Sequence, residues 1–78
     1  MANKLNKSDY EAGDILRIKF SWFNNIHEDV FIVLDEIQYW LVNINDFQLY
    51  DDDSPALNDS HLISVEIIKR RDEYTTGF

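Results

Sequence analysis

Apolar and polar side chains alternate along residues 15–22, with the period of two that a half-buried β-strand shows. The apolar positions are Leu16, Ile18, Phe20 and Trp22, and the polar positions are Arg17, Lys19 and Ser21. Only Ile15 departs from the alternation, and Gly13-Asp14 breaks the chain just before it. The pattern predicts a first strand over 15–22 that packs one face against a core.

Two apolar runs in the middle of the chain predict the next strands. Residues 30–34 read Val-Phe-Ile-Val-Leu without a polar interruption, which is typical of a central strand buried on both faces. Residues 39–44 predict a third strand with Trp40, Val42 and Ile44 on one side.

The C-terminal half predicts two more strands. Residues 47–50 form a short fourth strand, and residues 61–68 form the last one. In the last strand we expect Ser64 and Glu66 to face water at an edge.

The connections carry recognisable turn residues. Residues 23–28 link the first two strands, with Asn24 and Asn25 suited to the positive φ angles of a tight turn. Before the last strand, Ser54 is a helix N-cap candidate and Pro55 fits the first helical position. We therefore expect a single helical turn at this point.

Five short strands with one helical turn before the last predict a mostly β protein, a small five-stranded SH3-like barrel. The alternative is an open antiparallel sheet with a short helix on one face. In the barrel the first and last strands meet, which would place Arg17 and Lys19 near residues 69–71 and carry the acids to the opposite pole. We expect residues 1–78 to form a single domain with flexible ends at 1–12 and 72–78.

Charge is distributed unevenly along the chain. The net charge is -8, and no Lys or Arg occurs between Phe20 and Ile68. That segment has a net charge of -10, whereas the rest of the chain has +2. Such a field repels nucleic acid and attracts basic protein surfaces. The competing interpretation is an acidic face that serves solubility alone.

Several function classes lack their usual signals. The chain has no cysteine, and the only histidines are His27 and His61. Asp51-x-Asp53 resembles the start of a calcium loop, but the glycine and glutamate that should follow are missing. We therefore expect no enzyme activity, no cofactor and no metal site.

The location and the class of partner follow from similar arguments. There is no signal-peptide pattern, and no run reaches the roughly 18 apolar residues of a membrane-spanning helix. Residues 69–71 are basic but are followed at once by Asp72 and Glu73, which makes a poor phosphate grip. We expect a cytoplasmic protein that binds neither membrane nor nucleic acid directly.

The candidate partner-binding residues are the acids of the middle segment and two aromatic side chains beside them. Adjacent aspartates repel one another, so the run at 51–53 could gain stability by binding a positive surface. Exposed aromatic residues are frequent anchors of interfaces. The candidate residues are Trp22, Glu28, Asp29, Asp35, Glu36, Tyr39, Asp46, Asp51, Asp52 and Asp53.

Three segments resemble short proteins encoded by phages and prophages: Glu-Ala-Gly-Asp-Ile-Leu at 11–16, the apolar run at 30–34, and Tyr-Trp-Leu-Val-Asn-Ile at 39–44. The resemblance covers residues 11–50 and includes no catalytic motif. It implies a small accessory protein of a phage or mobile element, a group in which inhibitors of host defence or transcription are common. It assigns no functional residue in this chain.

Together, these features predict a non-catalytic acidic module that docks on a basic, nucleic-acid-binding surface of a host protein, such as a defence or transcription enzyme. Its carboxylates would occupy places that phosphates normally fill, as in a DNA mimic. If the protein is phage-encoded, it would act in the host cytoplasm. The alternative is a structural or assembly subunit that pairs through a strand edge or an aromatic patch, including pairing with copies of itself.

Overall fold

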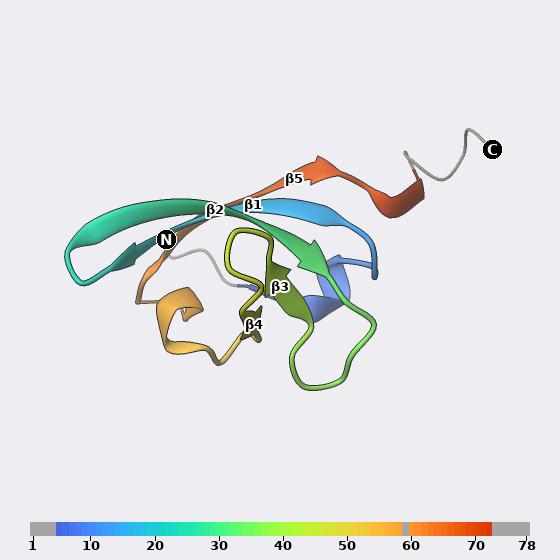
Figure 1. The fold of residues 1–78 in the computed structure, drawn as a ribbon, viewed down its shortest axis with the longest axis horizontal. Coiled ribbons are helices and arrows are strands. Elements are labelled where there is room, and N and C mark those ends of the chain that lie inside the picture. Colours follow the sequence, from blue (N-terminus) through green and yellow to red (C-terminus); the bar gives the residue numbers. More distant parts are fainter. Residues whose placement is uncertain (1–4, 59, 73–78) are drawn as a thin grey trace.

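The alternating segment forms the strand β1, part of a five-stranded antiparallel sheet with the order β4-β3-β2-β1-β5 (Figure 1). The computed structural model describes residues 5–58 and 60–72. The elements are η1 (Lys7–Asp9), β1 (Ile15–Trp22), β2 (Asn25–Val33), β3 (Leu41–Asn43), β4 (Leu49–Tyr50), η2 (Pro55–Leu57) and β5 (Leu62–Lys69), where η marks a 3-10 turn.

The sheet is open. β1 pairs with β2 on one side and with β5 on the other, so the first and last strands meet as predicted. Within residues 5–58 and 60–72, β4 and β5 do not pair, and they form the two edges. The structure therefore has the open sheet given as the alternative, with the strand order that a five-stranded barrel has when it is opened between β4 and β5.

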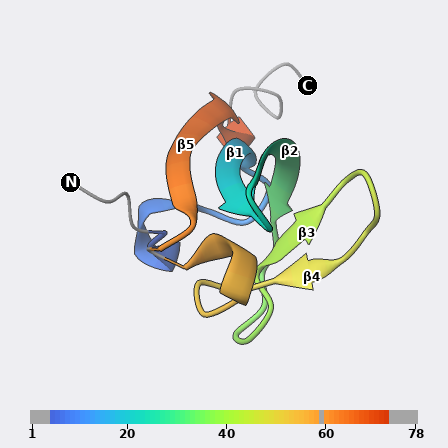
Figure 2. The same ribbon diagram turned by 90° about the vertical axis from the view of Figure 1, so that its left-hand side faces the viewer.

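The sheet is curved, and the buried core lies on its concave side. Figure 2 shows β5, β1 and β2 side by side, with β3 and β4 turning away from them and η2 on the concave side. We call this concave side the inner face and the opposite side the outer face. The buried core consists of Leu5, Leu16, Ile18, Phe20, Phe31, Val33, Trp40, Leu41, Leu57 and Leu62. Burial of these side chains, each worth about 1.5–3 kcal/mol before entropy is counted, holds the inner face together.

The strand β2 begins at Asn25, five residues earlier than predicted, so β1 and β2 form a long hairpin. Trp22 pairs with Asn25, so the turn is Phe23-Asn24 and not Asn24-Asn25. Both turn residues have positive φ angles, as a two-residue hairpin turn requires. Eight paired positions between the two strands fix this register, and they outweigh the cost of a phenylalanine at a position that favours asparagine or glycine.

The third strand turns a different face inward than predicted. Leu41 and Asn43 are buried on the inner face, whereas Val42 and Ile44 are on the outer side. Trp40 is buried too, but it precedes the strand. The pairing of Leu41 with Val33 sets this orientation, because paired residues of neighbouring strands share a face.

The helical turn before the last strand is confirmed as η2, with Pro55 at its first position. Ser54 does not cap it. Its hydroxyl instead accepts a hydrogen bond from the backbone N–H of Asp51 at 2.9 Å and donates to the carboxylate of that residue at 3.1 Å.

The two ends of the domain meet at a buried carboxylate. Asp14 is 0% exposed and accepts hydrogen bonds from the backbone N–H of Glu11 and of Arg71, at 2.9 and 2.8 Å. The guanidinium of Arg70 donates to it at 3.1 Å. Of the ends expected to be flexible, residues 5–12 place Leu5 in the core, while 1–4 and 73–78 lie outside the described residues.

Candidate functional site

Six of the ten acids of the middle segment lie in three loops that flank β3 and β4. Figure 1 shows the course of these loops. These are the loop 34–40 between β2 and β3, the turn 44–48 between β3 and β4, and the loop 51–54 before η2. Five exposed carboxylates define what we call the acidic lobe: Asp35, Glu36, Asp46, Asp52 and Asp53.

The turn of the β3–β4 hairpin is built on amide–carboxylate contacts. The buried Asn43 donates to Asp29 at 3.1 Å and accepts a bond from the backbone N–H of Asn45 at 2.8 Å. The side chain of Asn45 donates to the other oxygen of Asp29 at 3.0 Å. Asp29, a predicted binding residue, is thus engaged by two amides and holds the turn in place.

Asp46 and Phe47 complete this turn. The carboxylate of Asp46 accepts the backbone N–H of Gln48 at 2.9 Å, and the N–H of Phe47 donates to the carbonyl of Asn43 at 2.7 Å. Phe47 has φ = 59° and is 76% exposed. The backbone of a bulky residue is strained in the left-handed region. The turn therefore stores backbone strain at a residue whose aromatic ring is exposed to solvent.

Replacing Phe47 with Asn should raise the free energy of unfolding by about 0.5–1 kcal/mol, because asparagine adopts positive φ more readily and little packing is lost. Urea denaturation followed by circular dichroism measures the change. Phe47→Ala removes the same ring without relieving the backbone, and it should show no such gain. Equal stabilities of the two variants would contradict strain at this position.

The three aspartates of the run 51–53 have two different roles. The carboxylate of Asp51 forms hydrogen bonds within the loop, whereas those of Asp52 and Asp53 point into solvent. Asp51 accepts the backbone N–H of Asp53 at 3.0 Å and the hydroxyl of Ser54 at 3.1 Å, so its carboxylate fixes the loop. The exposed side chains of Asp52 and Asp53 form no hydrogen bond with the described residues. They remain available to a partner.

The loop 34–40 is anchored by its backbone. Leu34 donates to the carbonyl of Trp40 at 2.7 Å, and the ammonium of Lys7 donates to the backbone carbonyl of Glu36. The carboxylates of Asp35 and Glu36 form no ion pair with any described residue. The positive charge of Lys7 therefore lies beside these two carboxylates and offsets part of their negative charge without forming an ion pair with either.

The arginines that form ion pairs among the described residues lie on the other side of the domain. The guanidinium of Arg17 lies 2.8 Å from Glu66 and 3.9 Å from Glu28, and Arg70 lies 3.1 Å from Asp14. Glu28, another predicted binding residue, thus belongs to the β1–β2–β5 side and not to the lobe. No carboxylate of the acidic lobe forms an ion pair with a cation of the described residues, and Lys7 is the one cation shown to contact a loop of the lobe in that part of the chain, so a net negative potential remains there.

The pKa of Tyr50 reflects the negative charges near the β3–β4 hairpin. Burial raises the pKa of its hydroxyl above 10.0, and the negative charges of Asp46 and Asp29 raise the pKa further. The sense of the shift indicates that carboxylates from different parts of the hairpin act on one place.

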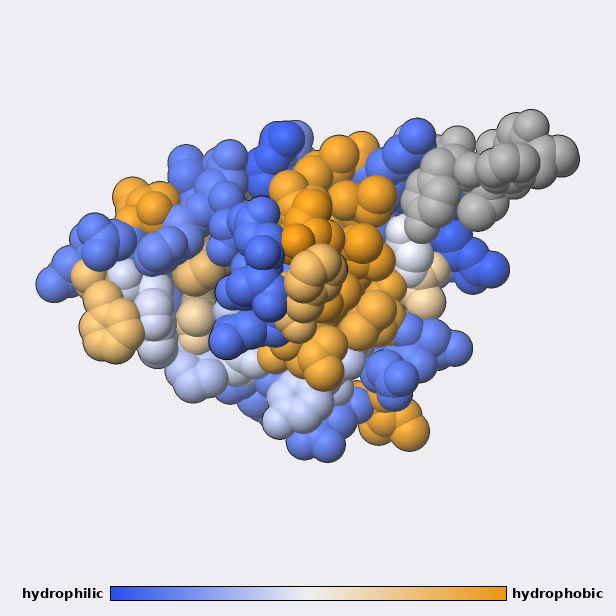
Figure 3. All heavy atoms as spheres, in the orientation of Figure 1, coloured by the Kyte–Doolittle hydropathy of each residue, from blue (hydrophilic) through white to orange (hydrophobic). Residues whose placement is uncertain are grey.

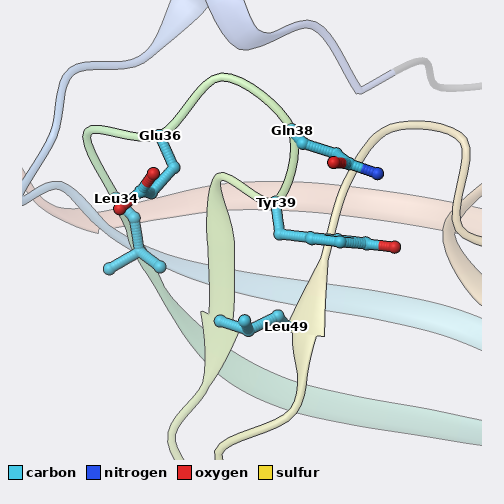
Figure 4. A pocket seen from close by; sticks show the side chains of 5 residues that line it. All are labelled: Leu34, Glu36, Gln38, Tyr39 and Leu49. Atoms are coloured by element: carbon cyan, nitrogen blue, oxygen red, sulfur yellow. The ribbon is translucent and has the colours of Figure 1, made fainter.

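Two apolar hollows adjoin the lobe. One, of about 430 Å³, is lined by Leu34, Glu36, Gln38, Tyr39 and Leu49 (Figure 4). The other, of about 300 Å³, is lined by Trp22, Gln48, Leu49, Tyr50, Ser54, Pro55 and Ala56. The two predicted aromatic residues, Tyr39 and Trp22, therefore lie in different hollows, and Leu49 lies between them.

The two histidines contact different aromatic rings. His27 stacks on Phe20 with the ring centres 5.3 Å apart, and His61 meets Trp22 edge-on at 5.1 Å. In the described part of the chain, no group of His, Asp and Glu residues is arranged to hold a metal ion. No helix among the described residues is long and apolar enough to cross a membrane.

Sequence reasoning missed Leu34, Gln38 and Leu49 as surface residues of a hollow. The sequence pattern predicts strand positions for Leu34 and Leu49 and gives no sign that they meet. They line one hollow because the loop 34–40 lies beside β4 in the folded chain. The fold and its loops thus define a small open-sheet domain with an acidic, partly apolar surface around β3 and β4. Comparison with protein-family models, curated proteins and solved structures found no match.

Proposed function

We propose that this protein is a non-catalytic binding module that docks its acidic lobe on a basic surface of a partner protein. The observation that carries the proposal is the set of five exposed carboxylates in the three loops at the two ends of the β3–β4 hairpin, none of them in an ion pair with a cation of the described residues. Unpaired surface charge of one sign costs self-repulsion, and a partner of opposite charge relieves it.

The class of partner follows from the charge and from the resemblance to phage and prophage proteins. A nucleic-acid-binding protein of the host, such as a defence or transcription enzyme, offers a basic groove made for phosphates. Carboxylates spaced over three loops can contact several basic side chains of such a groove at once. The proposed role is therefore that of an inhibitor that competes with nucleic acid.

Reversing Asp35, Asp52 and Asp53 together to Lys should weaken association with the partner about 100-fold or more, because like charges would then face each other across the interface. None of the three side chains forms a hydrogen bond or an ion pair with the described residues, so the fold should survive. The partner is first captured from a lysate of the host cell, and its affinity for each variant is then measured by calorimetry.

The matched control carries the same change in net charge outside the lobe, at Asp9, Glu11 and Asp72, which are exposed. This control should keep most of the affinity. Raising the salt concentration from about 0.05 to about 0.5 M should weaken wild-type binding, since exposed charges are screened at that ionic strength. If both triple variants lose affinity equally, net charge alone would explain the binding. That result would refute the lobe as the docking surface.

One observation favours the second candidate function, a structural or assembly subunit. β5 is an edge strand of eight residues, and Ile63, Ile67 and Ile68 are exposed along it. Long apolar edges invite pairing with another chain. Sedimentation at millimolar concentration would show a dimer or larger species in that case, and a monomer under the same conditions would reject self-assembly.

A further inference from the structure

The outer face of the sheet carries an apolar row that crosses four strands. Pairing aligns Leu49 of β4 with Val42 of β3, Val42 with Ile32 of β2, and Ile32 with Ile15 of β1. A second, shorter row lies beside it, formed by Val30 of β2 and Ile44, whose backbone N–H donates to the carbonyl of Val30 at 3.0 Å. Figure 3 shows the result as a hydrophobic band that runs across the strands between hydrophilic surfaces.

The fold of the single chain does not explain this band. The run 30–34 has the composition of a strand covered on both faces, yet only its inner residues Phe31 and Val33 are buried. Leu49 is 53% exposed. Four strands about 4.8 Å apart make the long row roughly 15 Å across, and the second row widens the apolar face by about 7 Å.

The band ends in the larger hollow. Figure 4 shows the ring of Tyr39 and the side chain of Leu49 one above the other, with Leu34 to one side and Glu36 and Gln38 on the loop above. A volume of about 430 Å³ is ample for one large apolar side chain. The hollow therefore offers a recess for such a side chain at the Leu49 end of the apolar row.

The charge of Glu36 favours some partner segments at the larger hollow over others. Glu36 lines the hollow, and its carboxylate forms no ion pair with the described residues, because the ammonium of Lys7 donates to the backbone carbonyl of Glu36 and not to its side chain. Across the band, Arg17 is already held between Glu28 and Glu66. A cation arriving beside the hollow is therefore attracted, and an anion is repelled. A second copy of the chain would bring another net charge of -8, which argues against it as the occupant.

We propose that the hollow and the outer band bind a partner segment in which a large apolar side chain lies next to Lys or Arg. The apolar side chain fills the space between Tyr39 and Leu49, and the cation meets Glu36. The rest of the segment covers the band from Leu49 to Ile15. The inference rests on the proposed function, because it names the element of the basic partner that the domain recognises.

Three short probe peptides separate the two parts of the proposal. They are acetyl-Ala-Lys-Phe-Lys-Ala-amide, its Glu-Phe-Glu analogue, and its Lys-Ala-Lys analogue. Titration is followed by nuclear magnetic resonance, using the amide signals of Gln38 and Tyr39 and the methyl signals of Leu49. The Lys-Phe-Lys peptide should bind at about millimolar strength, and each of the other two at least about tenfold more weakly.

Variants of the protein locate the contacts. Glu36→Gln should weaken the Lys-Phe-Lys peptide about threefold and leave the Glu-Phe-Glu peptide unweakened. Leu49→Gln should weaken both peptides that contain Phe. Phe23→Asn changes an exposed ring in the β1–β2 turn, outside both the hollow and the band, and serves as the folded control with unchanged affinity. Dispersed amide spectra establish that each variant is folded.

Equal binding of all three peptides, or no shift at these signals, would overturn the proposal. Concentration-dependent shifts on the band without any peptide would make a second copy the occupant and overturn it as well. The outcome is separable from that of the proposed function. If the lobe reversal abolishes capture of the partner while Leu49→Gln does not affect it, the docking role stands and the hollow is not part of it.

Discussion

Trp40→Ala is expected to lower the free energy of unfolding by about 3–5 kcal/mol, a large part of the total stability of an ordinary domain. Trp40 is 1% exposed, belongs to the core and stacks on Tyr10 with ring centres 6.1 Å apart. A domain of this length buries a modest share of its surface, so one lost indole is a large fraction of its stability. Far-ultraviolet circular dichroism in urea measures the change.

The neighbouring residue provides the control. Tyr39 is 43% exposed and lines the hollow, so Tyr39→Ala should cost less than about 1 kcal/mol. The two substitutions remove large rings at adjacent positions and differ mainly in burial. A loss for Trp40→Ala no greater than that for Tyr39→Ala would show that the core is not organised around the indole.

Asp14→Ala is expected to cost about 2–4 kcal/mol at neutral pH, because two backbone N–H groups and a guanidinium lose a charged acceptor. The cost falls on the junction between the first and last strands. Asp35→Ala removes an exposed carboxylate of the lobe and should change the stability by less than about 0.5 kcal/mol. Similar losses for the two would contradict the structural role of Asp14.

The contribution of Asp14 should also depend on pH. Burial by itself would raise its pKa, but the hydrogen bonds from Glu11, Arg71 and Arg70 outweigh burial, and the pKa lies below the ordinary value of 3.8. The unfolded chain then binds a proton more readily than the folded one. The stabilisation is therefore complete above about pH 5 and is lost as the pH falls through 3.8 and then through the folded-state pKa.

Urea denaturation of the wild type and of Asp14→Asn between about pH 2 and pH 7 tests this dependence. The difference in stability between the two proteins should shrink on acidification, because protonation removes from the wild type what the substitution has already removed. A constant difference over this range would mean that the carboxylate charge does not contribute. Asp35→Asn should follow the wild-type curve throughout.

Local patterns predicted most of the strands. The alternation at 15–22 matches β1, the Ser54-Pro55 pair precedes η2, and the last strand is displaced by one residue from its predicted bounds. These features depend on side-chain period and on turn chemistry, which are visible in a short window. The inward face of β3 could not be read in this way, since it is decided by which residues of β2 pair with it.

The candidate site was predicted in part. The acids at 35, 36, 46, 52 and 53 do lie in exposed loops around one hairpin. Asp29 and Asp51 are acidic residues of the same segment, but their carboxylates hold turns together. Glu28 lies beside Arg17. Sequence proximity could not separate these roles, because they depend on which polar groups the turns bring within hydrogen-bond distance.

The sequence by itself determined the β-rich class, the meeting of the first and last strands and the acidic character of the middle segment. The prediction that Arg17 and Lys19 lie near residues 69–71 was wrong, because the register places them opposite Glu66 and Ser64. The tertiary structure alone decided that the sheet stays open, that Asp14 is buried between the two ends, and that Leu34, Tyr39 and Leu49 surround a hollow next to Glu36. The reason is physical. Strand formation and charge follow from neighbouring residues, whereas strand register, burial and recesses follow from contacts between segments that are far apart in the chain.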